Sequence, residues 1–148
     1  MAAKFGFTLA ILTAMLASPM ASAQTAGSPA GTWLTQAGDA RVKVGPCGGA
    51  LCGSIVWLRD PIDPATGKPA IDDKNPDPAR AKRSMKGLQL FSDMKPAGPN
   101  KWSGHIYNAD DGKTYESNIS VASPDTLKVE GCIGGALCGS ENWRRVGR

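Results

Sequence analysis

The sequence predicts an all-β protein, a small antiparallel barrel of roughly eight strands with two hairpin disulfides. Short apolar or alternating runs recur between turn residues, and no segment has a convincing amphipathic helix pattern. The 148 residues include 18 Gly and 11 Pro, which are typical of a chain with many turns. Four cysteines lie in two short segments that resemble each other. Together these observations favour short strands joined by tight turns.

The first 23 residues have the pattern of a cleavable secretory signal. Their one charge is Lys4, an apolar stretch covers residues 5–16, and the segment ends in Ala21-Ser22-Ala23. The apolar stretch is about 12 residues long, shorter than the roughly 20 that span a bilayer. We therefore expect a signal peptide at residues 1–23, a linker at 24–30 and one barrel domain at 31–148. The mature protein would be exported to the periplasm or extracellular space, without a stable membrane anchor.

Three strands are expected before a long connection. The second of them carries the alternating pair Val42 and Val44, and the third contains Ile55-Val56-Trp57-Leu58. That apolar run has no polar face, so its strand is either covered on both sides or exposes an apolar surface. The expected bounds of the three strands are residues 31–36, 40–47 and 52–59.

Residues 60–86 show neither a strand nor a confident helix, and a connection of this length usually has a role or stays loose. Aspartates dominate its first part, with Lys68 and Lys74 among them, and four basic residues follow. The simplest interpretation is a solvated loop whose halves attract each other. The alternative is an interaction surface, whose candidate residues are Asp72, Asp73, Arg80, Lys82 and Arg83.

Five strands are expected after this connection. The clearest has Tyr115, Ile119 and Val121 on one face and polar residues on the other, between turns at Asp111-Gly112 and residues 123–125. Eight is a natural number of strands for a small closed barrel. The expected bounds of the last five strands are residues 87–91, 101–108, 113–122, 126–132 and 138–146.

The four cysteines lie in two matching segments. Cys47-Gly-Gly-Ala-Leu-Cys52-Gly-Ser54 is similar to Cys132-Ile-Gly-Gly-Ala-Leu-Cys138-Gly-Ser140, and an even number of cysteines in an exported chain indicates disulfides. The repeated spacing favours the local pairs Cys47–Cys52 and Cys132–Cys138. Chain entropy favours a long cross-link, at about 4.6 kcal/mol against about 2 kcal/mol for a short ring. A zinc site is the alternative, but the spacings are wide and the compartment oxidising, so no metal is expected.

Few residues offer the chemistry of an enzyme. His105 is the only imidazole and has no clear partners for a catalytic triad. The adjacent acids Asp72-Asp73 and Asp110-Asp111 are ordinary on solvated turns. Asp73-x-Asn75-x-Asp77 begins like an EF-hand loop, but Pro78 stands where that loop needs glycine. No glycine-rich phosphate loop opens a helix, so no cofactor is expected. The net charge of +4 is too small to indicate nucleic acid as a partner.

A set of short motifs, taken in order, resembles the domain-of-unknown-function family number 2147, which consists of small exported bacterial proteins. The resemblance implies an envelope location and a lipocalin-like barrel, but no known activity. The sequence departs from the family at Asn108-Ala109, where the family tends to have Asp-Pro. The motifs are Gly31-x-Trp33, Cys47-x4-Cys52-Gly53, Ile55-Val56-Trp57-Leu58, Asp72-x2-Asn75-Pro76-Asp77, Gly87-Leu88, Gly104-x-Ile106-Tyr107, Asp111-Gly112-Lys113-x-Tyr115 and Trp143-x-Arg145.

Two of these residues are expected to close the barrel. Lipocalin-like barrels place Gly-x-Trp on the first strand, with a late arginine packed over the indole, and Trp33 and Arg145 match those places. A cation–π contact of this kind contributes roughly 0.5 to 2 kcal/mol. We therefore expect a structural role for Trp33 and Arg145.

The leading hypothesis is a non-enzymatic barrel that binds a small or apolar ligand in the cell envelope. Its candidate ligand-binding residues are the aromatic side chains of Trp57, Trp102, Tyr107 and Tyr115, which alternatively fill the core. A second hypothesis is a protein-interaction module that uses loop 60–86 to contact an envelope protein. A third is an envelope hydrolase that uses Asp72, Asp73 or His105 as acid or base.

Overall fold

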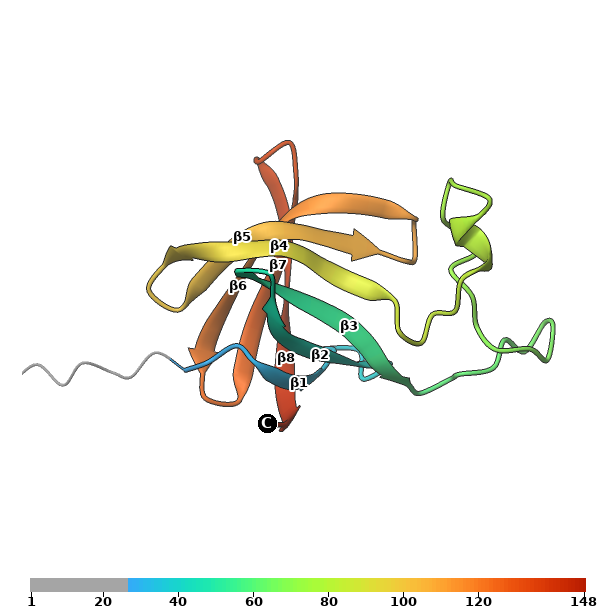
Figure 1. The fold of residues 1–148 in the computed structure, drawn as a ribbon, viewed down its shortest axis with the longest axis horizontal. Coiled ribbons are helices and arrows are strands. Elements are labelled where there is room, and N and C mark those ends of the chain that lie inside the picture. Colours follow the sequence, from blue (N-terminus) through green and yellow to red (C-terminus); the bar gives the residue numbers. More distant parts are fainter. Residues whose placement is uncertain (1–26) are drawn as a thin grey trace, which may run out of the picture.

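The computed structural model describes residues 27–148, which form a closed barrel of antiparallel strands paired in sequence order, with β8 returning to β1 (Figure 1). The predicted all-β class, the eight strands and the barrel are confirmed. The predicted signal peptide and residues 24–26 of the predicted linker lie outside the described residues. The strands are β1 (Gly31–Leu34), β2 (Ala40–Cys47), β3 (Ala50–Leu58), β4 (Gln89–Gly98), β5 (Lys101–Asn108), β6 (Lys113–Ser123), β7 (Thr126–Ile133) and β8 (Leu137–Gly147).

β4 is longer than the sequence pattern predicts. Its expected end was residue 91, whereas the strand continues through Pro96 to Gly98. The register between β4 and β5 shifts between Ser92 and Lys95, and Asp93 has a φ angle of 54°. Such bulges break the alternation of apolar and polar residues and accommodate a proline. For this reason the period of two was not visible beyond Phe91.

The core consists of side chains that alternate along the strands and point into the barrel. Phe91 and Trp143 meet at its centre, with ring centroids 5.3 Å apart. Gly53 lies against Phe91, because a Cβ atom there would approach Phe91 Cδ2 to 2.5 Å. The other fully buried side chains include Trp33, Val42, Met94, Ile119 and Leu127.

One end of the barrel is closed by Trp33 and Arg145. The two residues are paired between β1 and β8, and the guanidinium carbon of Arg145 lies 4.1 Å from the centre of the indole ring. The indole nitrogen of Trp33 donates to the carbonyl of Pro29 at 2.8 Å. Burial lowers the pKa of Arg145, whose guanidinium donates to three backbone carbonyls at 2.7 Å, those of Ser28, Ala30 and Pro124. The segment before β1 is thereby attached to the barrel.

Both disulfides form as predicted, within hairpins. Cys132 and Cys138 stand opposite each other on β7 and β8, with Cα atoms 4.1 Å apart. Cys47 and Cys52 are linked diagonally across β2 and β3, since Cys52 pairs with Gly45, and their Cα atoms are 5.5 Å apart. Two disulfides fit an oxidising compartment outside the cytoplasm.

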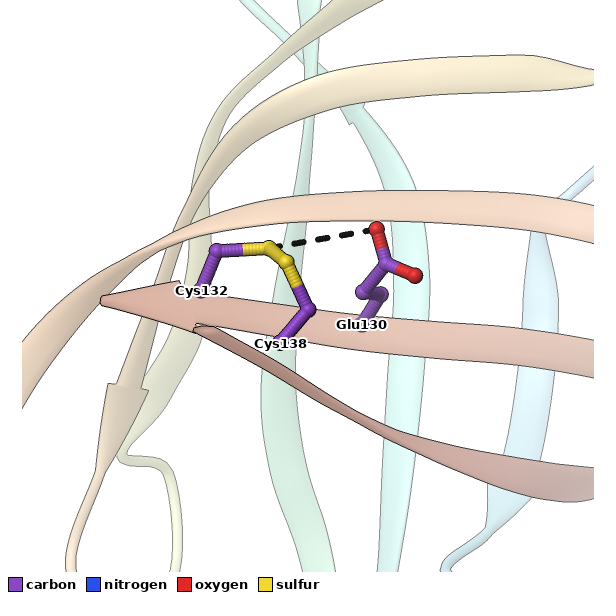
Figure 2. Close-up of side chains that lie close together, drawn as sticks. All are labelled: Glu130, Cys132 and Cys138. Carbon is purple, nitrogen blue, oxygen red and sulfur yellow. Dashed lines mark hydrogen bonds between the residues drawn. A yellow bond between two sulfur atoms is a disulfide. The ribbon is translucent and has the colours of Figure 1, made fainter. Parts of the chain in front are cut away.

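Glu130 lies beside the second disulfide, with its Oε1 atom 3.9 Å from Cys132 Sγ (Figure 2). The disulfide sulfur has no proton to donate, so this contact is not a conventional hydrogen bond. Glu130, Cys132 and Cys138 are close enough to share a metal ion, but bonded sulfurs are not thiolate ligands. The zinc alternative therefore finds no support at this position. Within residues 27–148, no helix has the length and apolar character needed to cross a membrane.

Candidate functional site

A cavity of about 600 Å³ opens at the end of the barrel opposite Trp33 and Arg145. The β1–β2 and β5–β6 turns and the end of the β7–β8 hairpin contribute to its mouth. Pockets that bind small organic molecules have volumes of roughly 300 to 1,000 Å³. The barrel is therefore filled by side chains at one end and hollow at the other.

The inner part of the cavity is apolar. Ile55, Val129 and Trp143 are buried core residues that also line the cavity. The Trp143 indole nitrogen donates to Glu141 Oε2 at 2.8 Å, which satisfies its single donor. Apolar side chains from the surrounding strands and the long loop complete this lining, namely Leu58, Met85, Leu90 and Ile106.

Two glycines keep part of the wall open. Gly131 and Gly139 are paired across β7 and β8, and both line the cavity. A Cβ atom on Gly139 would meet nothing within 4 Å. Beyond them, the pair Ile133 and Leu137 lines the mouth with 60% and 73% of their surfaces exposed. The mouth therefore presents apolar side chains to solvent.

The long loop between β3 and β4 is attached to the barrel by a buried carboxylate. Asp72 is only 1% exposed, and Tyr107 donates its hydroxyl to Oδ1 at 2.6 Å. Arg83 donates to Oδ2 through Nε at 2.9 Å and lies 2.8 Å away through Nη2, while Asn75 donates to Oδ2 at 3.1 Å. We call Asp72, Asn75, Arg83 and Tyr107 the Asp72 cluster. These hydrogen bonds join Asp72, Asn75 and Arg83 of the loop to Tyr107 of β5, and so attach the loop to the barrel.

The same loop packs closely on the β5–β6 turn. Gly112 has a φ angle of 70°, and a Cβ atom there would lie 2.0 Å from the carbonyl oxygen of Lys74. The turn residue and the loop backbone are therefore in direct contact. Met85, near the end of the loop, lines the cavity. Figure 1 shows the loop between β3 and β4 in green beside the barrel. Loop position and cavity shape are thus linked.

Both tyrosines of the chain contribute to the cavity wall, and the pKa of each is raised. For Tyr107 the main cause is burial, followed by the hydrogen bond to Asp72. For Tyr115 the main cause is its hydrogen bond to the Asp111 carboxylate, which in turn lowers the pKa of Asp111. In both cases the neutral phenol is the form that the folded protein favours.

Tyrosine ionisation is therefore expected to be suppressed by folding. In an unfolded chain each phenol would be half ionised at pH 10.0, its ordinary pKa. In the folded protein less than half of the tyrosine signal should appear at that pH, as measured by ultraviolet absorbance titration. Because the folded pKa of Tyr107 is raised, its contribution to stability is present below pH 10.0 and is lost as the pH rises further. Identical titration curves for folded and urea-unfolded protein would contradict this.

The model of a protein family described as "Uncharacterized protein conserved in bacteria (DUF2147)" matches residues 31–145, almost all of the described chain. The chain belongs to the DUF2147 family. No curated protein matches it. A solved structure, the protein HP1028 from the human pathogen Helicobacter pylori, which is described as belonging to the lipocalin family, superposes with a TM-score of 0.69. The two chains share 24% identity over 81% of this chain and 84% of that one, and the likeness shows a lipocalin-like fold.

The structure separates the four aromatic residues that were expected to bind a ligand. Tyr107 and Tyr115 line the cavity of the DUF2147 chain, whereas Trp57 and Trp102 do not. Trp57 is 36% exposed and stacks under the Arg41 guanidinium, 4.6 Å from its ring centre. Trp102 pairs with the buried Ile119 and packs against the core. The expected cavity role of the two tryptophans is corrected accordingly, because strand register places them elsewhere.

The structure exposes only some of the residues that were proposed for an interaction surface. Asp73, Arg80 and Lys82 are exposed on the loop. Asp72 is buried and cannot present its carboxylate to a partner, and Arg83 is bound to it. His105 is exposed on β5, paired with Ser92 and Glu116, and does not line the cavity.

Sequence reasoning missed several cavity residues of the DUF2147 chain. Glu141, Gly139 and Leu137 line the cavity at every second position before Trp143. Extending the alternation of β8 backward from Trp143 would have found them. Asp39 and Asp110 also line the cavity, but they lie in turns. There the alternation of a strand does not predict which way a side chain points.

Proposed function

We propose that this protein binds a small, largely apolar molecule in the cavity of its barrel and does not act on it chemically. The observation that carries the proposal is the cavity of about 600 Å³, whose inner lining is formed by buried apolar residues. Releasing water from such a surface contributes about 25 cal/mol per Å² of apolar area. The lipocalin-like fold of the structural neighbour supports the same proposal.

We also propose that the protein works in the cell envelope, in the periplasm or outside the cell. The two disulfides support this location, since such bonds persist in oxidising compartments. The signal-like pattern of residues 1–23 is the second support. The alternative role of loop 60–86 as a contact surface for an envelope protein stays a prediction, and of its candidate basic residues Arg80 and Lys82 are exposed.

The substitution Gly139→Phe is expected to weaken ligand binding without unfolding the protein. Gly139 lines the cavity and has open space around its Cα, so a phenyl ring there would occupy the volume that a ligand needs. Binding of the neutral probe N-phenyl-1-naphthylamine, measured by fluorescence, should weaken at least about tenfold, or 1.4 kcal/mol. Thermal unfolding of the variant verifies that the barrel is intact.

Gly45→Phe is the matched control. Gly45 also lies on a strand with no atom near its would-be Cβ, but it does not line the cavity. The probe should bind this variant as it binds the unchanged protein. Equal probe binding by Gly139→Phe and the unchanged protein would place the probe outside the cavity. Absence of saturable binding to the unchanged protein would overturn the proposed function.

A further inference from the structure

The charges that line the cavity are all of one sign. The whole chain has 17 Lys and Arg against 13 Asp and Glu, a net charge of +4. The cavity nevertheless carries three carboxylates, and no lysine, arginine or histidine among the described residues lines it. Its acidic residues are Asp39 in the β1–β2 turn, Asp110 in the β5–β6 turn and Glu141 on β8.

These carboxylates are not neutralised by the protein. In residues 27–148 the ion pairs involve other acids, and none includes Asp39, Asp110 or Glu141. Two basic residues of the neighbouring loop, Arg59 and Arg83, are already paired, with Asp60 and Asp72. The cavity mouth therefore has negative charge without a cation of its own.

Two of the carboxylates are oriented by neutral donors that leave their charge in place. The hydroxyl of Thr35 donates to Asp39 Oδ1, and the indole of Trp143 donates to Glu141 Oε2. Each group retains a second oxygen that is not used in these bonds. The donors also lie in the cavity lining, which keeps both carboxylates at its wall.

The rest of the lining offers apolar and aromatic surfaces. Ile55, Val129 and Trp143 offer an apolar inner surface. Tyr107 and Tyr115 add aromatic rings to the wall, and an aromatic face attracts an organic cation. An anionic ligand such as a fatty acid would place its carboxylate among three others, where like charges repel.

We propose that the ligand is an amphiphilic cation, with an apolar body inside the barrel and a protonated amine at the acidic mouth. This inference rests on the proposed function and names its ligand class. A carboxylate at the mouth would accept a hydrogen bond from the ammonium, and such charge-assisted bonds are stronger than those of neutral groups. The other two carboxylates would attract the cation through their negative charge. Their exposure to water limits the gain in affinity to about tenfold.

The test compares three probes that share one alkyl chain, decylammonium, decanol and decanoate, by competition with N-phenyl-1-naphthylamine at neutral pH and low ionic strength. Decylammonium is expected to bind about tenfold more tightly than decanol, and decanoate more weakly than either. Higher salt should reduce the difference, because exposed charges are screened.

A triple variant isolates the acidic mouth, namely Asp39→Asn, Asp110→Asn and Glu141→Gln. These substitutions retain the side-chain shape and an acceptor for Thr35 and Trp143. The preference for decylammonium should disappear in this variant. The matched control is Asp60→Asn with Asp73→Asn and Asp125→Asn, which changes the net charge equally at residues that do not line the cavity. The control should retain the preference.

The possible outcomes separate this inference from the function on which it rests. Equal or stronger binding of decanol or decanoate would overturn the cationic ligand and leave apolar binding intact. Failure of all three alkyl probes to compete, while N-phenyl-1-naphthylamine still binds, would also overturn it. Loss of the preference in the control triple variant would assign the effect to net charge rather than to the mouth. No binding of any probe, including the neutral reporter, would overturn the proposed function as well.

Discussion

Trp33→Ala is expected to lower the free energy of unfolding by about 3 to 5 kcal/mol. The indole is fully buried, pairs with Arg145 between the first and last strands and donates to the carbonyl of Pro29. Alanine would leave a cavity at the closed end and remove the surface on which the Arg145 guanidinium lies. Denaturant unfolding followed by circular dichroism measures the change.

Trp57→Ala is the matched control for this prediction. It removes the same side chain from a position that is 36% exposed, where the ring contacts the Arg41 guanidinium on the outer face. Its expected cost is about 1 kcal/mol, because an exposed cation–π contact contributes roughly 0.5 to 1 kcal/mol. Equal losses in the two variants would show that Trp33 does not stabilise the closed end more than an ordinary surface aromatic residue.

Asp72→Ala is expected to detach the long loop from the barrel and to cost about 2 to 3 kcal/mol. The substitution removes the acceptor of Tyr107, Asn75 and Arg83. The Arg83 side chain is 38% exposed and would regain water, so the cost stays below that of a fully buried ion pair. The pKa of Tyr107 should fall as well, because its hydrogen bond to the carboxylate is one cause of the raised value.

Hydrogen exchange and limited trypsin digestion distinguish local detachment from global unfolding. In Asp72→Ala, exchange should accelerate in residues 69–87 while the strands stay protected, and trypsin should cleave after Arg80, Lys82 or Arg83. Asp73→Ala is the control, since the Asp73 side chain is 63% exposed and its expected effect is within about 0.5 kcal/mol. An Asp72 variant as resistant to trypsin as this control would show that the carboxylate does not attach the loop.

Much of the fold was predictable because it depends on nearby residues. The predicted bounds of β2 and β5 match the structure, and those of the other strands except β4 differ by a few residues at their ends. Both disulfides were predictable from the spacing of the cysteines, since a hairpin brings its two strands within disulfide range. β4 was shortened in the prediction because its bulge at Asp93 changes which face each later residue occupies.

The Asp72 cluster could not be predicted from the sequence, because it depends on contacts between distant residues. The sequence marked Asp72 as a charged residue in a long loop, and its burial depends on Tyr107 from β5 reaching that loop. The exposed Trp57 and the buried Trp143 have the same side chain, and only strand register separates them. Neither distinction is present in the local pattern of residues.

The sequence by itself determined the all-β class and the antiparallel barrel and favoured the two local disulfides, because alternation, turn residues and cysteine spacing act over a few positions. Only the tertiary structure decided that one end of the barrel is filled by Trp33 and its neighbours while the other is hollow. It also brought Asp39, Asp110 and Glu141 to one cavity. These residues belong to distant parts of the chain, and closing the sheet through the pairing of β1 with β8 sets which side chains share its interior.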